Sequence, residues 1–291
     1  MVHTILYLVR FRSFSDWGSR EWCDLGLESP REVKIISDVH GAFGALRKVA
    51  LDPGPLLILG DLVNFVDYRT GDGMVSDVFG AEFVRDVAKF RASGDYESSR
   101  DLWRETAEAI QGDVRALFRE ALLGQYQEMS EALAGAEAYV TFGNVDTPDL
   151  LEEALPPGCR YVDGQKIEIE GWTIGFVGGG APSPLGTPGE VTETDLEAKL
   201  EALGPVDILC THLPPAIEPL RFDTVAQRTE GSSEAILRYL VARRPAYHYF
   251  GDVHQPRASR WQVGATLCRN VGYFRATGRP TFHPARITGL P

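Results

Sequence analysis

The sequence predicts an α/β fold in which much of the sheet is parallel. Short apolar runs rich in β-branched residues recur along the chain, and helical patterns lie between many of them. Such alternation is typical of strands connected through helices, which leaves neighbouring strands parallel. A length of 291 residues is sufficient for one large core, or for a core with a cap.

The composition is that of an ordinary globular protein, with 44% apolar and 24% charged residues. A formal net charge of −12 disfavours nucleic-acid polymers and anionic membrane surfaces as partners. A small anionic substrate is still compatible with this charge, because a bound metal ion inverts the local field. The four cysteines lie far apart and form no CxxC pair, so we expect no structural zinc site and a reducing, cytoplasmic location.

The N-terminal stretch is expected to be an extension of the main domain. Residues 1–32 contain a short apolar segment that Arg10 and Arg12 interrupt, and no small-residue cleavage site follows it. This pattern fits neither a signal peptide nor a membrane span. We therefore expect an extension at 1–32, either an added strand and loop or a poorly ordered segment, followed by one domain at 33–291.

Seven apolar runs are expected to form buried strands, and an eighth candidate lies near the C-terminus. The eight runs cover residues 33–37, 55–60, 138–143, 166–170, 172–178, 206–211, 246–251 and 265–274.

Helical patterns follow several of these runs. Residues 43–50 predict a short helix, and Thr192 with Asp195 resembles a capping box ahead of a leucine stripe. A further helix is expected within residues 232–244, with apolar residues on one face at Ile236, Leu237, Leu240 and Val241.

Residues 65–137 interrupt the alternation, since they contain no convincing strand pattern. Apolar residues recur at helical spacing in three stretches, and glycines at 94, 112, 124 and 135 lie where helices are expected to end. The segment contains eight basic and fifteen acidic residues, so it is not expected to bind a polyanion. We interpret it as an insertion of three or four helices between two core strands.

Five of the predicted strands end in polar residues of types that bind metal ions. In chain order these residues are Asp38 and His40, Asp61 and Asn64, Asn144 and Asp146, His212, and Asp252 and His254. The carboxyl ends of parallel strands lie along one sheet edge, so we expect these side chains to meet. Carboxylate, amide and imidazole ligands suit Mn²⁺, Fe, Zn²⁺ or Mg²⁺, and two ions that share one bridging carboxylate would use the whole set.

Each of these motifs alone is a weak signal. An Asp-x-His pair is more often a turn aspartate beside an ordinary histidine, and Asn144 alone reads as a turn or cap residue. Asp252 alone reads as a solvated loop acid. The prediction depends on five such coincidences in order, each directly after an apolar run.

The complete series resembles the calcineurin-like metallophosphoesterase superfamily over about residues 33–275. The motifs that carry the resemblance are Asp38-x-His40, Gly60-Asp61-x-x-Asn64, Gly143-Asn144-x-Asp146, His212 and Gly251-x-x-His254. The resemblance implies a four-layer α/β/β/α sandwich of two mixed sheets. It also implies hydrolysis of small phosphate mono- or diesters at a dinuclear metal centre, through attack by a hydroxide between the two ions.

The resemblance also assigns roles to individual residues. Asp38, His40 and His254 would hold the first ion, Asp61 would bridge, and Asn144, His212 and Asp252 would hold the second. Asn64 and Asn144 would contact the substrate. The residues expected to serve catalysis are Asp61, Asn144 and Asp146, the last of them as support for the metal ligands.

Two positions depart from the family pattern. Val145 stands where the family has a histidine that is credited with protonating the leaving group, so we expect a preference for leaving groups of low pKa. Asp252 stands where the family has a histidine ligand. A carboxylate there shifts the preference toward harder ions such as Mn²⁺ or Mg²⁺, and we expect Mn²⁺. Alternatively, Asp252 is too short to reach, and the second site is weak or empty. The alternative function is a non-catalytic or weakly active binding or scaffold protein with the same fold, and the oligomeric state is not predicted.

Three further features have simpler interpretations. His248 is expected to pack within a strand. The three glycines at 178–180 predict a tight turn, whose N–H groups would alternatively face a phosphate. Arg221 and Arg228 follow His212 in the chain and either contact a phosphate or lie on the surface.

Overall fold

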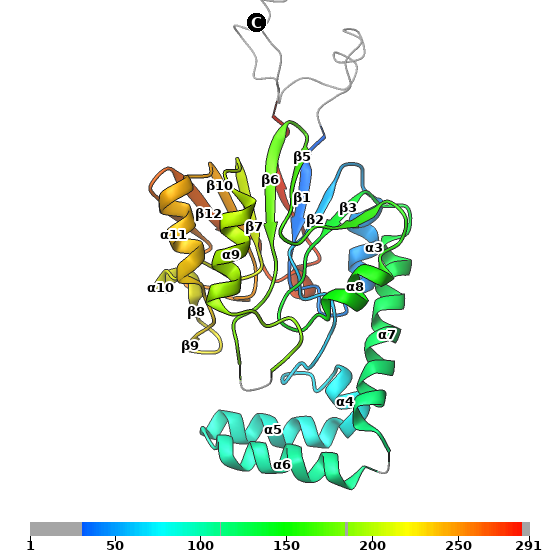
Figure 1. Ribbon diagram of the computed structural model, residues 1–291. Coiled ribbons are helices and arrows are strands. Elements are labelled where there is room, and N and C mark those ends of the chain that lie inside the picture. The colour runs from blue at the N-terminus through cyan, green and yellow to red at the C-terminus, as the bar shows by residue number, and fades with distance from the viewer. Residues whose placement is uncertain (1–30, 111, 184–185, 287–291) are drawn as a thin grey trace, which may run out of the picture.

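Two mixed β-sheets lie face to face, with helices on their outer sides (Figure 1). The computed structural model describes residues 31–110, 112–183 and 186–286. The expected N-terminal extension therefore lies almost wholly outside the described residues, and the boundary after residue 32 stays a prediction.

The first sheet has five strands in the order β13-β1-β2-β3-β4. The strands β1 to β4 are parallel, and β13 pairs antiparallel with β1 at one edge. Their bounds are β1 Val33–Ile36, β2 Leu56–Ile58, β3 Ala138–Val140, β4 Cys159–Tyr161 and β13 Thr281–His283.

The second sheet has six strands in the order β11-β12-β10-β7-β6-β5. Its four central strands are parallel, and the outer strands β11 and β5 pair antiparallel with their neighbours. The bounds are β5 Lys166–Ile169, β6 Trp172–Val177, β7 Ile208–Thr211, β10 Tyr247–Phe250, β11 Arg260–Val263 and β12 Thr266–Asn270. The expected eighth strand at 265–274 thus ends at Asn270, and α12 (Phe274–Thr277) follows it.

The central strands are apolar on both faces because both faces are covered. Ile35 and Leu57 of the first sheet point inward and pack in one cluster with Phe176 of the second sheet. Their neighbours Ile36 and Ile58 point outward and pack against the helices α3 (Phe43–Leu51), α7 (Val114–Leu133) and α8 (Pro148–Ala154). The helices α9 (Glu193–Leu203) and α11 (Glu234–Arg243) cover the second sheet in the same way. The predicted α/β/β/α sandwich is confirmed.

The two predicted amphipathic helices after residue 190 both form. The Thr192 hydroxyl accepts the Asp195 N–H at 3.2 Å, as expected for a cap. In α11 the residues Ile236 and Leu240 are fully buried. The expectation that Val241 shares their face is wrong, since its side chain is 59% exposed. It lies one position beyond Leu240, which turns it by about 100° around the helix.

Four helices connect β2 to β3 and form the expected insertion: α4 (Met74–Phe79), α5 (Ala81–Ser93), α6 (Tyr96–Ala109) and α7. Gly94 ends α5 with a left-handed φ of 75°. The expectation that Gly124 ends a helix is wrong, because Gly124 lies inside α7. Residues of α7 on both sides of Gly124 pack into the core, and these tertiary contacts override the low helix propensity of glycine.

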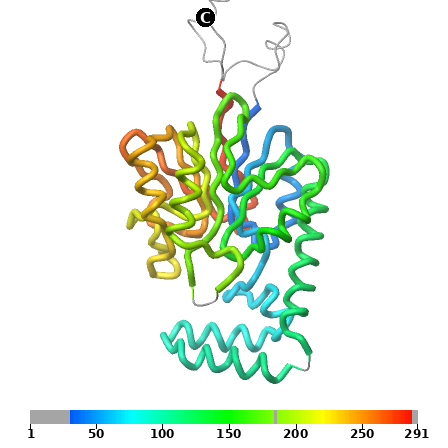
Figure 2. The backbone as a smooth tube through the Cα atoms, in the orientation of Figure 1, coloured from blue at the N-terminus to red at the C-terminus, as the bar shows by residue number. Residues whose placement is uncertain are grey.

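The insertion has a small aromatic core of its own, built around Phe79, Phe83 and Trp103. Figures 1 and 2 show α5 and α6 as a pair below the sandwich, whereas α7 runs back along the first sheet. A short hairpin, β8 (Phe222–Asp223) and β9 (Arg228–Thr229), follows α10 (Glu218–Arg221). No helix in the described ranges is long and apolar enough to span a membrane.

Candidate metal centre

The polar residues after β1 and β2 are held side by side by the backbone. These two strands are parallel neighbours, with Ile36 opposite Ile58. The pairing continues past the strand ends, since the Asp38 N–H donates to Gly60 O at 3.1 Å and the His40 N–H donates to Asp61 O at 2.9 Å. The two loops therefore position their side chains as one unit.

The backbone is strained at the predicted ligands. Seven described residues other than glycine have a positive φ, and four of them are predicted ligands: Asp38 (60°), His40 (42°), Asp61 (55°) and Asp252 (64°). The left-handed region is costly for residues with a Cβ, and such strain is concentrated at functional sites. The backbone conformation, which does not depend on the type of side chain that binds metal, thus points to the same loops as the ligand chemistry.

Two glycines let the loops approach each other. A Cβ on Gly143 would lie 2.1 Å from Asp61 Oδ1. A Cβ on Gly251 would lie 2.0 Å from Ser37 Oγ and 2.6 Å from Asp38 Oδ2. Any side chain at either position would displace a predicted ligand, which explains why a glycine precedes Asn144 and Asp252.

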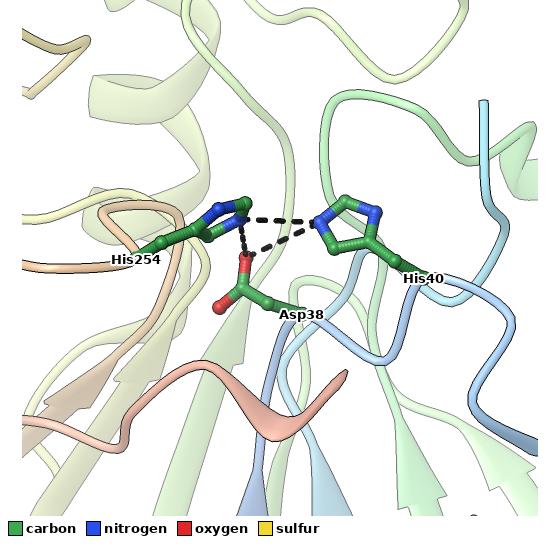
Figure 3. Close-up of side chains that lie close together, drawn as sticks. All are labelled: Asp38, His40 and His254. Atoms are coloured by element: carbon green, nitrogen blue, oxygen red, sulfur yellow. Dashed lines mark hydrogen bonds and ion pairs between the residues drawn. The ribbon is translucent and has the colours of Figure 1, made fainter. Parts of the chain in front are cut away.

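Asp38, His40 and His254 point toward one another (Figure 3). The Nε2 atoms of the two histidines are 3.3 Å apart, and Asp38 Oδ1 lies 3.6 Å from His254 Nε2 and 3.9 Å from His40 Nε2. Asp38 is 1% exposed, and its Oδ1 has no hydrogen-bond partner among the described residues. A buried carboxylate oxygen without a donor is unfavourable, and a cation between these three atoms would satisfy it.

The hydrogen bonds of two histidines direct their Nε2 atoms into the site. His40 Nδ1 lies 3.3 Å from Val63 O, and His212 Nδ1 lies 2.9 Å from Leu59 O. A carbonyl oxygen only accepts, so each Nδ1 must carry the proton. In the neutral ring this leaves the lone pair on Nε2 free for a metal ion, an arrangement common in metal sites.

Asp61 lies between the two halves of the site. Its Oδ2 is 3.6 Å from His40 Nε2, and its Oδ1 is 3.5 Å from His212 Nε2. Two triads of ligand atoms, each within 4.8 Å of one another, share Asp38: one contains His40 and His254, and the other contains Asp61 and His212. Among the described ligands, Asp61 is the one whose two oxygens face histidines of different triads, which is the geometry that the expected bridging position requires.

Asn144 and Asp252 complete the half of the site around His212. His212 Nε2 lies 3.3 Å from Asn144 Oδ1 and 3.6 Å from Asp252 Oδ1. The Asp252 N–H also donates to Asp38 Oδ2 at 3.2 Å. The Asp252 carboxylate therefore lies beside His212, on the side of the site where the family that the motifs resemble has a histidine.

Asp146 holds the loops and does not line the cavity at the site. Its carboxylate is fully buried and accepts four backbone N–H groups, from Asp61 at 2.8 Å, Gly143 at 2.9 Å, Leu62 at 3.0 Å and Val63 at 3.4 Å. Burial and the nearby Asp61 charge raise the pKa of Asp146 to about 6, and the N–H donors of Gly143 and Leu62 offset only part of that rise. These four hydrogen bonds hold the loop that carries Asp61, so Asp146 acts on the site as a positioning residue.

Charges in the site oppose one another. Although burial opposes ionisation, His212 and His40 hold the pKa of Asp61 well below its usual value. Burial likewise disfavours the charged form of His212, but Asp61 and Asp252 raise its pKa well above the usual range. For His40 burial prevails and lowers its pKa. The buried carboxylates and imidazoles of the site thus set one another's pKa values. Protons and a metal ion would compete for the same ligand atoms.

The residues present fit a pair of divalent cations. The set supplies three carboxylates, three imidazoles and one amide, and no thiolate, which suits Mn²⁺, Fe, Zn²⁺ or Mg²⁺. The unpartnered Asp38 Oδ1 and the facing Nε2 atoms of His40 and His254 favour occupation of the first half.

A cavity of about 540 Å³ opens over these ligands. Asn64, which we expect to contact the substrate, lines this cavity, and Gln125 of α7 fixes its backbone by accepting the Asn64 N–H at 2.6 Å. Sequence reasoning missed Tyr273, whose ring stacks on His254 at 3.9 Å between centroids. It also missed Tyr68 and Arg91, which the insertion contributes to the wall.

The contacts of the glycines at 178–180, of Arg221 and Arg228, and of His248 decide between the interpretations that the sequence left open. The N–H groups of residues 178, 179 and 180 donate to Asp163 Oδ1, Phe142 O and Gly189 O, so they are not available to a phosphate. Arg228 lines the cavity, whereas Arg221 does not and donates to Ser232 Oγ at 3.0 Å. His248 is fully buried within β10, as predicted.

No protein-family model matches the sequence, and no curated protein matches it either. Solved structures do match the chain, and three of them are as follows. A crystal structure described without a protein name is 17% identical with a TM-score of 0.53, and the match covers 88% of this chain and 100% of that chain. The protein TT1561 of Thermus thermophilus is 13% identical with a TM-score of 0.48, over 88% of this chain and 99% of that one. A novel archaeal phosphodiesterase is 13% identical with a TM-score of 0.32, over 87% and 91%. The first likeness shows a shared fold, and the two-sheet sandwich seen here is consistent with the metallophosphoesterase fold that the sequence motifs resemble.

Proposed function

We propose that this protein is a metal-dependent hydrolase of small phosphate mono- or diesters. The observation that carries the proposal is the position of Asp61, whose two oxygens lie 3.6 Å from His40 Nε2 and 3.5 Å from His212 Nε2. When bound, a pair of divalent ions, with Mn²⁺ favoured, lowers the pKa of water toward neutrality and neutralises phosphoryl oxygens.

The side chains divide into two holding groups. Asp38, His40 and His254 would hold one ion, Asn144, His212 and Asp252 would hold the other, and Asp61 would contact both. Asn64 and Asn144 both line the cavity, and their amides can donate to phosphoryl oxygens and orient the ester. Asp146 keeps Asp61 in place through the backbone.

The surroundings of Val145 favour esters whose leaving group departs without being protonated. Val145 lines the cavity and packs against the core cluster between the first sheet and the helices on its outer face. The only histidines that line the cavity in the described chain are His40 and His254, which are both assigned as ligands. With no separate imidazole to protonate the departing oxygen, the chain favours substrates such as aryl esters, whose leaving groups are stable as anions.

The cavity supports a small substrate over a polymer. Its volume of about 540 Å³ is in the range of small-molecule sites. The net charge of −12 opposes the approach of a nucleic-acid chain.

The experiment is to strip the protein of metal, reload it with Mn²⁺, and measure hydrolysis of bis(4-nitrophenyl) phosphate and 4-nitrophenyl phosphate. We expect hydrolysis of at least one ester, and loss of it in Asp61→Asn. Asp149→Asn serves as the matched control, because Asp149 is an acid on α8 that does not line the cavity. Tight binding of metal without hydrolysis of either ester would instead favour a binding or scaffold protein.

A further inference from the structure

One part of the cavity wall comes from the insertion and from the β8–β9 hairpin. Tyr68 lies in the loop before α4, Arg91 lies in the last turn of α5, and Arg228 lies in β9. These residues line the same cavity as His40 and His254. A substrate held at the metal ligands therefore occupies the same cavity as Tyr68 and Arg91.

Arg91 carries an unpaired positive charge on this wall. Its guanidinium lies over the Tyr68 ring, 4.9 Å from the centroid, and no carboxylate partner is found for it within the described ranges. The other two arginines of the wall are compensated, since Arg69 lies 3.7 Å from Asp67 and Arg228 lies 2.8 Å from Glu230. An uncompensated cation stands out in an insertion with eight basic and fifteen acidic residues.

The Tyr68 hydroxyl is also without a partner. Its oxygen is buried and forms no hydrogen bond with the described part of the protein. Burial raises the pKa of Tyr68 despite the opposing charges of Arg91 and Arg228, so the hydroxyl is a neutral donor close to both arginines. A buried hydroxyl with no acceptor is unfavourable and calls for an explanation, which a ligand acceptor at this place would supply.

We propose that Tyr68 and Arg91 form an anion-binding subsite, and that the preferred substrate carries a second phosphate group at the end remote from the ester that is cleaved. The inference rests on the proposed function. A guanidinium presents a planar fork that binds phosphate oxygens in pairs, and stacking on the Tyr68 ring orients that fork before the ligand arrives. The hydroxyl of Tyr68 donates a further hydrogen bond to the same group.

The test uses two 4-nitrophenyl phosphodiesters that share one short alkyl chain, which ends in a phosphate in one and in a hydroxyl in the other. The quantity measured is the ratio of their kcat/KM values with the Mn²⁺-loaded protein. We expect the ratio to favour the phosphate end. Loss of a charge-assisted hydrogen-bond pair in Arg91→Ala is expected to lower it by about 10- to 100-fold.

Two further variants separate binding from a structural role. Tyr68→Phe keeps the ring beneath Arg91 and removes only the unpartnered hydroxyl, so it is expected to lower the ratio by about 3- to 10-fold without lowering the melting temperature. Arg85→Ala is the matched control, because Arg85 is exposed on the same helix α5 and does not line the cavity. It is expected to leave the ratio unchanged.

Calorimetry with propane-1,3-bisphosphonate distinguishes failure of the subsite from failure of the proposed function. If neither diester is hydrolysed but Arg91→Ala still weakens bisphosphonate binding by about tenfold or more, the subsite stands and the hydrolase proposal fails. Hydrolysis of both diesters with the same ratio in the wild type, Arg91→Ala and Tyr68→Phe would overturn the subsite.

Discussion

Replacing Asp146 by Asn tests how the site is held together. Each carboxylate oxygen accepts two backbone N–H groups: Oδ2 accepts those of Asp61 and Gly143, and Oδ1 accepts those of Leu62 and Val63. An Asn of the same shape has one oxygen, so two of the four N–H groups would face its NH₂ group. Each buried N–H group left without an acceptor costs about 1–3 kcal/mol. Removing a charge that burial and Asp61 disfavour recovers part of this loss, so we expect a net loss of roughly 1–3 kcal/mol in the free energy of unfolding. That is a sizeable part of the roughly 5–15 kcal/mol that stabilises a typical domain.

The assay is urea denaturation of the metal-free protein at neutral pH, followed by circular dichroism. Asp149→Asn removes an acid from the first turn of α8 and is expected to cost at most about 1 kcal/mol. We also expect Asp146→Asn to weaken metal binding, because Asp61 loses its anchor. A loss below about 1 kcal/mol in Asp146→Asn would refute the reasoning that these four hydrogen bonds hold the loops.

Three other predictions follow from single features of the structure. Gly251→Ala is expected to abolish tight metal binding, measured by calorimetry, because the alanine Cβ would lie 2.0 Å from Ser37 Oγ and 2.6 Å from Oδ2 of the ligand Asp38. The control is Gly44→Ala, whose new Cβ has nothing within 4 Å. This control is expected to raise the free energy of unfolding by up to about 1 kcal/mol. With Val145 in place of a proton donor, we expect rates on alkyl phosphoesters to be about 10²–10⁴-fold below those on aryl esters, and Val145→His to narrow that gap; equal rates in the wild type would contradict this. Burial lowers the pKa of His248 to about 3 and that of His283 to about 4, so the folded protein holds both neutral while the unfolded chain takes up protons below about 6.5. The free energy of unfolding should therefore fall as the pH drops from about 6.5 toward 3, by at most about 1.4 kcal/mol per pH unit for each histidine. His248→Gln should reduce this slope. A slope in the variant identical to that of the wild type would count against the assignment of the effect to His248.

The elements that carry the site could be predicted from the sequence because two signals coincide there. Apolar runs such as residues 33–37 and 206–211 indicate strands buried on both faces, and the first polar residues after them lie at a common sheet edge. Asp38, His40 and His212 were recognisable for this reason. The strained φ of Asp38 and His40 was not predictable, because it is imposed by pairing with the neighbouring loop.

Five strands escaped prediction: β4, β8, β9, β11 and β13. Each is two to four residues long, and the sequence of β11, Arg260–Val263, contains no run of apolar residues. Short edge strands form where a neighbouring strand offers free N–H and C=O groups, which a sequence pattern does not reveal.

The cavity wall was missed for a different reason. Arg91 lies on a predicted helix, one position after Phe90, and nothing in that pattern distinguishes it from a surface arginine. Its place beside Tyr68 depends on how α5 returns across the site. Tyr273 was assigned to a strand that in fact ends at Asn270. Contacts between distant segments decide both roles, and local periodicity carries no information about them.

The most direct test of the central claim is the stoichiometry of Mn²⁺ binding to the metal-free protein, measured by titration calorimetry with the wild type and Asp61→Asn. If Asp61 joins the two triads, the wild type binds two ions per chain, and the variant retains at most one tightly held ion. A wild-type protein that binds no Mn²⁺, Fe²⁺, Zn²⁺ or Mg²⁺ at micromolar concentrations would contradict the account, as would a variant that binds two ions as tightly as the wild type.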